Sequence, residues 1–69
     1  MNTTQSEILA NQMVDMAFIT SFTGLTDKFF YKQISLDRFP KPIKLGRSSR
    51  WLKSEIELWV QQRIAISRP

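Results

Sequence analysis

The sequence predicts one mainly α-helical domain with a small β-hairpin, in which three helices accompany two short strands. Apolar residues recur at helical spacing in three separate segments. A turn that contains glycine joins the first two segments, as in a helix-turn-helix. Between the second and third segments, two prolines interrupt any helix, and a short alternating stretch after them indicates a hairpin.

Length and composition exclude several classes of protein. A chain of 69 residues forms one small domain, and such domains bury only about 60% of the surface that the unfolded chain exposes. The chain contains no Cys, no His and no glycine-rich phosphate loop, which removes thiolate metal sites and the commonest general base. We therefore expect no catalytic residues, no metal and no cofactor, and we do not predict an enzyme. The lack of a signal-peptide pattern and of a long apolar segment predicts a soluble cytoplasmic protein.

The charge of the chain is concentrated in one block. The net charge is +4, but residues 28–53 carry eight bases and one acid, whereas residues 1–27 carry three acids and no base. A basic block can be no more than a solvated surface, as charged residues usually are. Its concentration favours a footprint for the phosphates of nucleic acid.

The predicted domain spans residues 14–66, between a flexible tail at residues 1–13 and a short tail at residues 67–69. Thr4 and Glu7 have the spacing of a capping box, so a short helix is the alternative for the first tail. We assign no function to either tail.

Two short helices joined by a tight turn form the centre of the predicted domain. Asp15 is expected to cap the first helix, at residues 16–22. Gly24 supplies the positive φ that a tight helix exit requires. Thr26 is expected to cap the second helix, at residues 27–35. The side chains expected to face the first helix are Leu25, Phe30 and Ile34.

The second helix carries the first group of candidate DNA-binding residues, since the N-terminal half of a recognition helix meets base edges in the major groove. This group consists of Thr26, Asp27, Lys28, Phe29, Tyr31 and Lys32. The two lysines can bind phosphate or guanine, and Tyr31 can donate to a phosphate or stack. Asp27 either accepts from cytosine or only complements the helix dipole. Phe29 either packs against the hairpin or contacts a thymine methyl group.

Residues 43–45 and 50–52 are expected to form the two strands of the hairpin, with residues 46–49 as its turn. An isolated hairpin is only marginally stable, so its apolar side chains should pack onto the helices. The side chains expected to do so are Ile43, Leu45 and Trp51.

The tip of the hairpin carries the second group of candidate DNA-binding residues, namely Lys44, Arg47, Ser48, Ser49 and Arg50. Two arginines flank two small hydroxyl residues, which makes the tip narrow and basic enough to enter or straddle a minor groove. The serines can bind phosphates. The alternative is an ordinary polar hairpin turn.

A third helix is expected from Glu55 to Ile64 or just beyond, because Ser54 and Glu57 have capping-box spacing. Its apolar stripe consists of Ile56, Trp59, Val60 and Ile64. The aromatic residues Phe18, Phe22, Phe30, Trp51 and Trp59 have the spacing of core residues rather than of a base-stacking platform. Phe39, beside Pro40, is expected to fill the junction between the second helix and the hairpin.

Three motifs occur together and in order along residues 14–64. They are the Thr-Gly-Leu turn at residues 23–25, the Phe-Pro-Lys-Pro junction at residues 39–42 and the Trp-Leu-Lys-Ser-Glu-Ile-Glu segment at residues 51–57. Each alone is weak, but jointly they are specific. In these motifs the chain resembles the AlpA-type family of prophage regulators.

The resemblance implies a winged helix-turn-helix related to MerR-type domains and to small phage excisionases, with the hairpin as the wing. It implies an excisionase, or recombination directionality factor, that binds and bends attachment-site DNA and helps a tyrosine integrase excise a prophage or genomic island. The implied partners are double-stranded DNA, a tyrosine integrase and further copies of the chain along the DNA. The implied location is the nucleoid of a bacterial cell.

Two alternatives remain open from the sequence. The resemblance also fits a transcriptional regulator, often of an integrase gene. A member of a different class, a small protein-interaction inhibitor, would bind DNA only incidentally.

Overall fold

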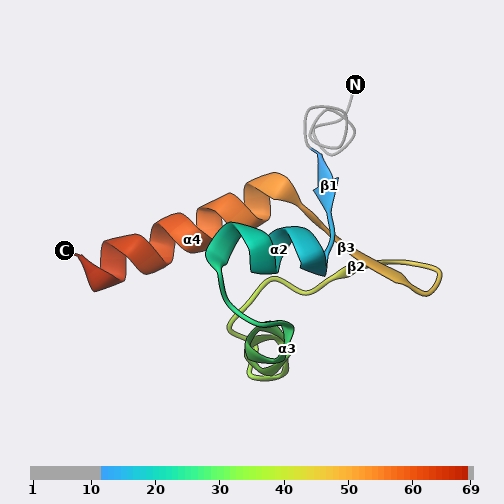
Figure 1. Cartoon of the computed structure of the whole chain (residues 1–69), viewed down its shortest axis with the longest axis horizontal. Coiled ribbons are helices and arrows are strands. Elements are labelled where there is room, and N and C mark those ends of the chain that lie inside the picture. Colours follow the sequence, from blue (N-terminus) through green and yellow to red (C-terminus); the bar gives the residue numbers. More distant parts are fainter. Residues whose placement is uncertain (1–11, 69) are drawn as a thin grey trace.

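The structure is a computed structural model that describes residues 12–68 (Figure 1). Three helices and a three-stranded antiparallel sheet make up this part of the chain, which confirms the mainly helical, winged fold that the sequence predicts. The elements in chain order are β1 (Met13–Val14), α2 (Met16–Thr23), α3 (Asp27–Ser35), β2 (Ile43–Leu45), β3 (Ser48–Leu52) and α4 (Lys53–Ser67). No helix within residues 12–68 is long and apolar enough to cross a membrane.

The helix-turn-helix forms through the caps that the sequence predicts. The Asp15 carboxylate accepts from the Phe18 N–H at 3.0 Å, and the Thr26 hydroxyl accepts from the Phe29 N–H at 3.3 Å. Gly24 ends α2 with a φ of 75°, a backbone conformation that only glycine adopts readily. The turn therefore fixes the direction in which α3 leaves α2.

The sheet contains one strand that the sequence did not reveal. In β1, Met13 pairs with Leu52 and Val14 pairs with Trp51, so that β3 lies between β1 and β2. The prediction placed Met13 at the end of a flexible tail, of which residues 1–11 lie outside the described residues. A two-residue strand is too short to produce a detectable alternation.

The hairpin is tighter than predicted. Leu45 pairs with Ser48 and Lys44 with Ser49, so the turn consists of Gly46 and Arg47 alone. Gly46 has a φ of 64° at the first turn position, as two-residue hairpin turns of type II′ require. The prediction of a four-residue turn was wrong because two serines of turn-like composition continue the β3 ladder.

The core is small, apolar and largely aromatic. It consists of Val14, Ile19, Phe30, Phe39, Trp51 and Ile56. The Phe39 ring lies 5.0 Å from the Phe30 ring and 4.9 Å from the Trp59 ring, centroid to centroid. Phe39 therefore fills the junction between α3 and the hairpin, as predicted. The Trp51 indole N–H donates to the Pro40 carbonyl at 2.8 Å, which ties β3 to the proline segment.

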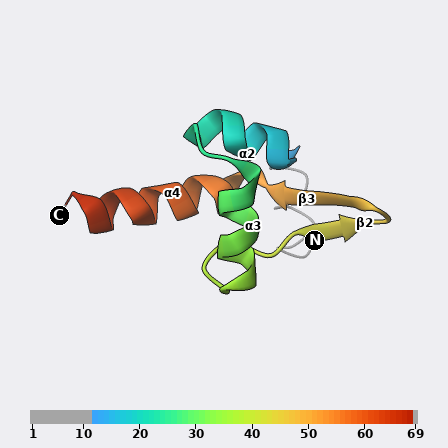
Figure 2. The same cartoon turned by 60° about the horizontal axis from the view of Figure 1, so that its bottom comes forward.

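The prediction that both hairpin strands pack onto the helices was wrong for β2. Trp51 is fully buried, but Ile43 is exposed and Leu45 has 53% of its surface exposed. Ile43 and Leu45 pair with Arg50 and Ser48, so they lie on the face of the hairpin opposite to Trp51. The hairpin also projects from the body, with β2 as its outer strand (Figure 2). Leu25, which was expected to face α2, and Ile64 of the predicted α4 stripe are also exposed.

Helix α4 begins and ends differently from its prediction. The Glu55 carboxylate accepts from the Leu52 N–H at 3.2 Å, so the cap forms before Lys53 rather than at Ser54. The reason is that β3 leads into α4 without a loop, which leaves Ser54 inside the first turn. The helix continues to Ser67, beyond the predicted end of the domain at residue 66.

A test of this core is the substitution Phe39→Ala. We expect it to lower the free energy of unfolding by about 3–5 kcal/mol, because a buried aromatic ring leaves a cavity that neighbouring rings cannot fill. Urea denaturation followed by circular dichroism measures the change. As a matched control, Leu45→Ala on exposed β2 should change the free energy by less than about 0.5 kcal/mol; similar losses for both variants would contradict this description of the core.

Candidate nucleic-acid interface

The exposed face of α3 carries three of the predicted DNA-binding residues. Phe30 is fully buried and Ile34 packs against the same core, so α3 turns its opposite face to solvent. Lys28, Tyr31 and Lys32 lie on that face and are exposed. Two cations and a phenol one helical turn apart can reach phosphates or base edges in a major groove.

The first turn of α3 is occupied by its own cap. The Asp27 carboxylate accepts from the Lys28 N–H at 2.9 Å, while the Thr26 hydroxyl accepts from a backbone N–H as described above. A carboxylate in this position complements the positive end of the helix dipole. The geometry therefore favours the capping role for Asp27 over an acceptor role toward cytosine. The Thr26 hydroxyl keeps its own proton to donate.

Phe29, which was predicted either to pack against the hairpin or to contact a thymine methyl group, lies beside α4. Its ring meets the Phe30 ring edge-on, with the centroids 5.1 Å apart, and its outer side faces α4. About two-fifths of its surface, 38%, is exposed. Phe29 therefore stands at the border between the lysine face of α3 and a groove along α4.

The wing distributes its polar residues over both faces. Because cross-strand partners share a face and side chains alternate, Lys44 and Ser49 lie on the face of Trp51, and Ser48 and Arg50 lie on the other. The Lys44 ammonium donates to the Ser49 hydroxyl at 2.7 Å. The wing therefore presents cations on both of its faces. It does not form a single tip in which two arginines flank two serines.

The two arginines of the wing differ in exposure and in hydrogen bonding. Arg47 occupies the turn and is exposed, whereas Arg50 is half-buried and its guanidinium donates to the Ser49 carbonyl at 2.9 Å. Arg47 is therefore the residue best placed to enter a groove, and Arg50 stiffens the strand beside it.

Two exposed bases that the prediction did not select lie between α3 and β2. Arg38 and Lys41 belong to the connecting segment, and Lys41 makes only a surface ion pair of 3.9 Å with Asp37. Such exposed pairs are weak and exchange readily for phosphate. Their membership of the basic block at residues 28–53 was the signal that could have found them.

The two halves of the interface, α3 and the wing, extend from the same core. Both views show α3 between the wing on one side and α4 on the other, with α4 pointing away from the wing (Figures 1 and 2). Within residues 12–68 no cluster of three or more carboxylates gathers as a metal site. The site is therefore a surface of lysine, arginine and hydroxyl groups around a helix and a wing.

A basic helix-turn-helix followed by a two-stranded wing defines the class of small winged helix-turn-helix DNA-binding proteins. Within this class the chain belongs to the AlpA family of prophage regulators: the family model for the prophage CP4-57 regulatory protein (AlpA) matches residues 12–64. The match confirms the resemblance that the sequence motifs indicate, and it includes β1. Comparison with curated proteins finds no match, and comparison with solved structures finds none.

The interface predicts strongly salt-dependent binding to duplex DNA. If the helix and wing neutralise roughly 4–6 phosphates, the logarithm of affinity falls with the logarithm of salt concentration with a slope of about −4 to −5. Fluorescence anisotropy with a labelled duplex measures this slope.

Single charge removals refine this prediction. Removal of one cation should make the slope less negative by about one. The substitutions that test this are Lys28→Ala, Lys32→Ala and Arg47→Ala. The control is Arg68→Ala, because Arg68 follows the end of α4 farthest from the wing. A flat salt response of the unsubstituted protein would contradict phosphate binding by this surface.

Proposed function

We propose that this protein is an excisionase-like recombination directionality factor, which acts by binding double-stranded DNA rather than by catalysis. The observation that carries the proposal is that a basic helix face and a basic wing extend from one small core. In this proposal α3 enters the major groove, and Arg47 at the turn of the wing meets the adjacent minor groove or its phosphates.

Contact by both a helix and a wing favours bent DNA, because bending brings more phosphate within reach of the protein. Bending the DNA of a binding site costs on the order of 1–6 kcal/mol, which additional charged contacts can offset. In this role several copies bind along an attachment site. The bent DNA then brings a tyrosine integrase to the recombining ends, so that a prophage or genomic island is excised.

A second candidate function uses the same surface for transcription. The description of the matched family names a regulatory protein, which favours a regulator of a promoter such as that of an integrase gene. In that role the protein changes the amount of integrase and takes no part in the recombining complex. A small protein-interaction inhibitor is the third candidate, and it alone requires neither Lys32 nor Arg47.

The deciding experiment measures excision in cells that supply the cognate attachment sites and an integrase from a constitutive promoter. The double variant Lys32→Ala, Arg47→Ala should lose at least about tenfold in DNA affinity and most of the excision, because one cation is removed from the helix and one from the wing. Its circular dichroism spectrum should be unchanged, since both side chains are exposed. Gln61→Ala, an exposed polar change on α4, should behave as the unsubstituted protein.

The alternatives give different results in the same cells. If the protein is a transcriptional regulator, its loss changes the level of integrase mRNA from the native promoter. Excision then stays intact when integrase is supplied constitutively. A protein-interaction inhibitor keeps its effect in the double variant even though gel shifts are lost. Either result would sink the directionality role.

A further inference from the structure

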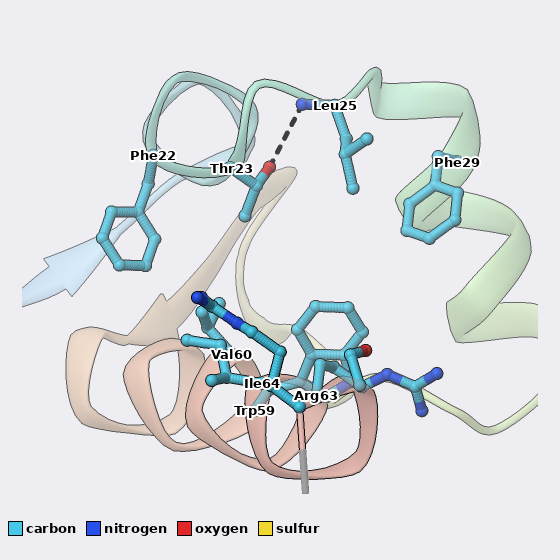
Figure 3. A pocket seen from close by; sticks show the side chains of 10 residues that line it. Phe22, Thr23, Leu25, Phe29, Trp59, Val60, Arg63 and Ile64 are labelled. Atoms are coloured by element: carbon cyan, nitrogen blue, oxygen red, sulfur yellow. Dashed lines mark hydrogen bonds between the residues drawn. The ribbon is translucent and has the colours of Figure 1, made fainter.

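Apolar side chains that the core leaves uncovered gather between the α2–α3 corner and the second half of α4 (Figure 3). One wall of this α4 groove carries Phe22, Leu25 and Phe29, and the facing wall carries Trp59, Val60 and Ile64. The groove has a volume of about 460 Å³. It is an open cleft between the α2–α3 corner and α4 rather than an enclosed cavity.

The exposure of these side chains is high for large apolar residues in so small a domain. Phe22, Leu25 and Ile64 expose 50%, 43% and 45% of their surfaces. Within residues 12–68 no other element covers them, because α4 runs past the body and away from the wing (Figures 1 and 2). Contiguous apolar surface of this kind marks an interaction site in a folded protein.

The rim of the groove is cationic. The Arg63 guanidinium lies over the Trp59 ring, 5.9 Å from its centroid, which holds the charge at the edge of the groove. Arg68 lies at the end of the groove nearest the C-terminus, and hydroxyl groups of Thr23 and Ser67 complete the lining. No carboxylate is among the described residues that line it.

We propose that the α4 groove binds an amphipathic helix of another protein, with the apolar stripe of that helix in the groove and its carboxylates against Arg63 and Arg68. An apolar floor of facing side chains suits a helix that presents apolar residues at i, i+3 or i+4, and i+7. The cationic rim selects helices with acidic flanks.

Charge disfavours a second copy of the chain as the occupant. A symmetric contact between two α4 grooves places Arg63 and Arg68 of both copies together, and each copy carries a net charge of +4. The exposed apolar residues of the wing of a second copy are also unsuitable as occupants of the groove, because the cations Lys44 and Arg47 lie within two residues of Leu45.

The groove can be occupied while DNA is bound. Of the predicted DNA-binding residues, only Phe29 also lines the groove. The wing and the free end of α4 point in opposite directions (Figures 1 and 2), and none of Lys28, Lys32 and Arg47 lines the groove. The inference therefore concerns a separate surface and stands or falls independently of the proposed function.

The test uses the whole protein and two synthetic peptides, without DNA. The first peptide is an amphipathic helix with leucine at i, i+3, i+4 and i+7 and glutamate on its flanks, and the second has lysine in place of every glutamate. Amide NMR spectra of the isotope-labelled protein report the site, because Trp59 lines the groove and its indole N–H, held by a 2.8 Å hydrogen bond to the Arg38 carbonyl, gives a separate signal from the same ring. The acidic peptide should shift this signal and the Ile64 amide, and leave the buried Trp51 indole unchanged.

Variants on one helix provide matched controls. Ile64→Ser and Arg63→Glu should each weaken binding of the acidic peptide by about tenfold, through lost apolar contact and through charge reversal. Leu58→Ser, on the same helix but outside the groove and with 55% of Leu58 exposed, should leave binding unchanged. All three variants should retain the DNA affinity of the unsubstituted protein.

Four outcomes would overturn the proposal. They are the absence of any shift with the acidic peptide, equal shifts with both peptides, shifts confined to Lys28, Lys32 and the wing, and equal binding by the Ile64 and Leu58 variants. Concentration-dependent shifts of the groove signals without peptide, together with a dimer in sedimentation, would assign the groove to a second copy instead.

Discussion

The buried indole of Trp51 holds the parts of the domain together. Its ring packs edge-on against Phe39, with centroids 6.3 Å apart, and its N–H donates to the Pro40 carbonyl. Its backbone pairs with Val14 of β1. Since β3 forms one strand of the wing and continues directly into α4, this one residue links the wing, the proline segment after α3 and the base of α4. The position of the basic wing relative to α3 therefore depends on it.

The second indole, of Trp59, closes the core on the other side. It packs against Phe30 and Phe39 and donates its N–H to the Arg38 carbonyl, whereas its outer surface carries Arg63. Beyond Trp59 there is no further element for α4 to pack on within residues 12–68. The domain consequently has two surfaces of different chemistry: a polar cationic surface on α3 and the wing, and an apolar groove along α4.

The prediction succeeded where neighbouring residues decide the structure. Asp15, Gly24 and Thr26 fix the ends of α2 and α3 by hydrogen bonds and backbone preferences that span only a few residues. The prediction failed where the pairing of strands, rather than residue composition, decides. Ser48 and Ser49 have turn-like composition, but pairing with β2 draws them into a strand, and β3 running into α4 displaces the cap from Ser54.

The sequence by itself determined the class of fold, the order of the three helices and the two hairpin strands, and the block of charge that lies on α3 and the wing, because helical spacing, caps and charge are local properties of the chain. The family motifs at residues 23–25, 39–42 and 51–57 are equally local. Only the tertiary structure decided which apolar residues are buried. Phe22, Leu25 and Ile64 have the spacing of core residues, but the core is filled by Phe30, Phe39 and the two indoles before α4 reaches its second half. A periodic pattern shows which face of a helix is apolar, and only the packed chain shows whether anything covers that face.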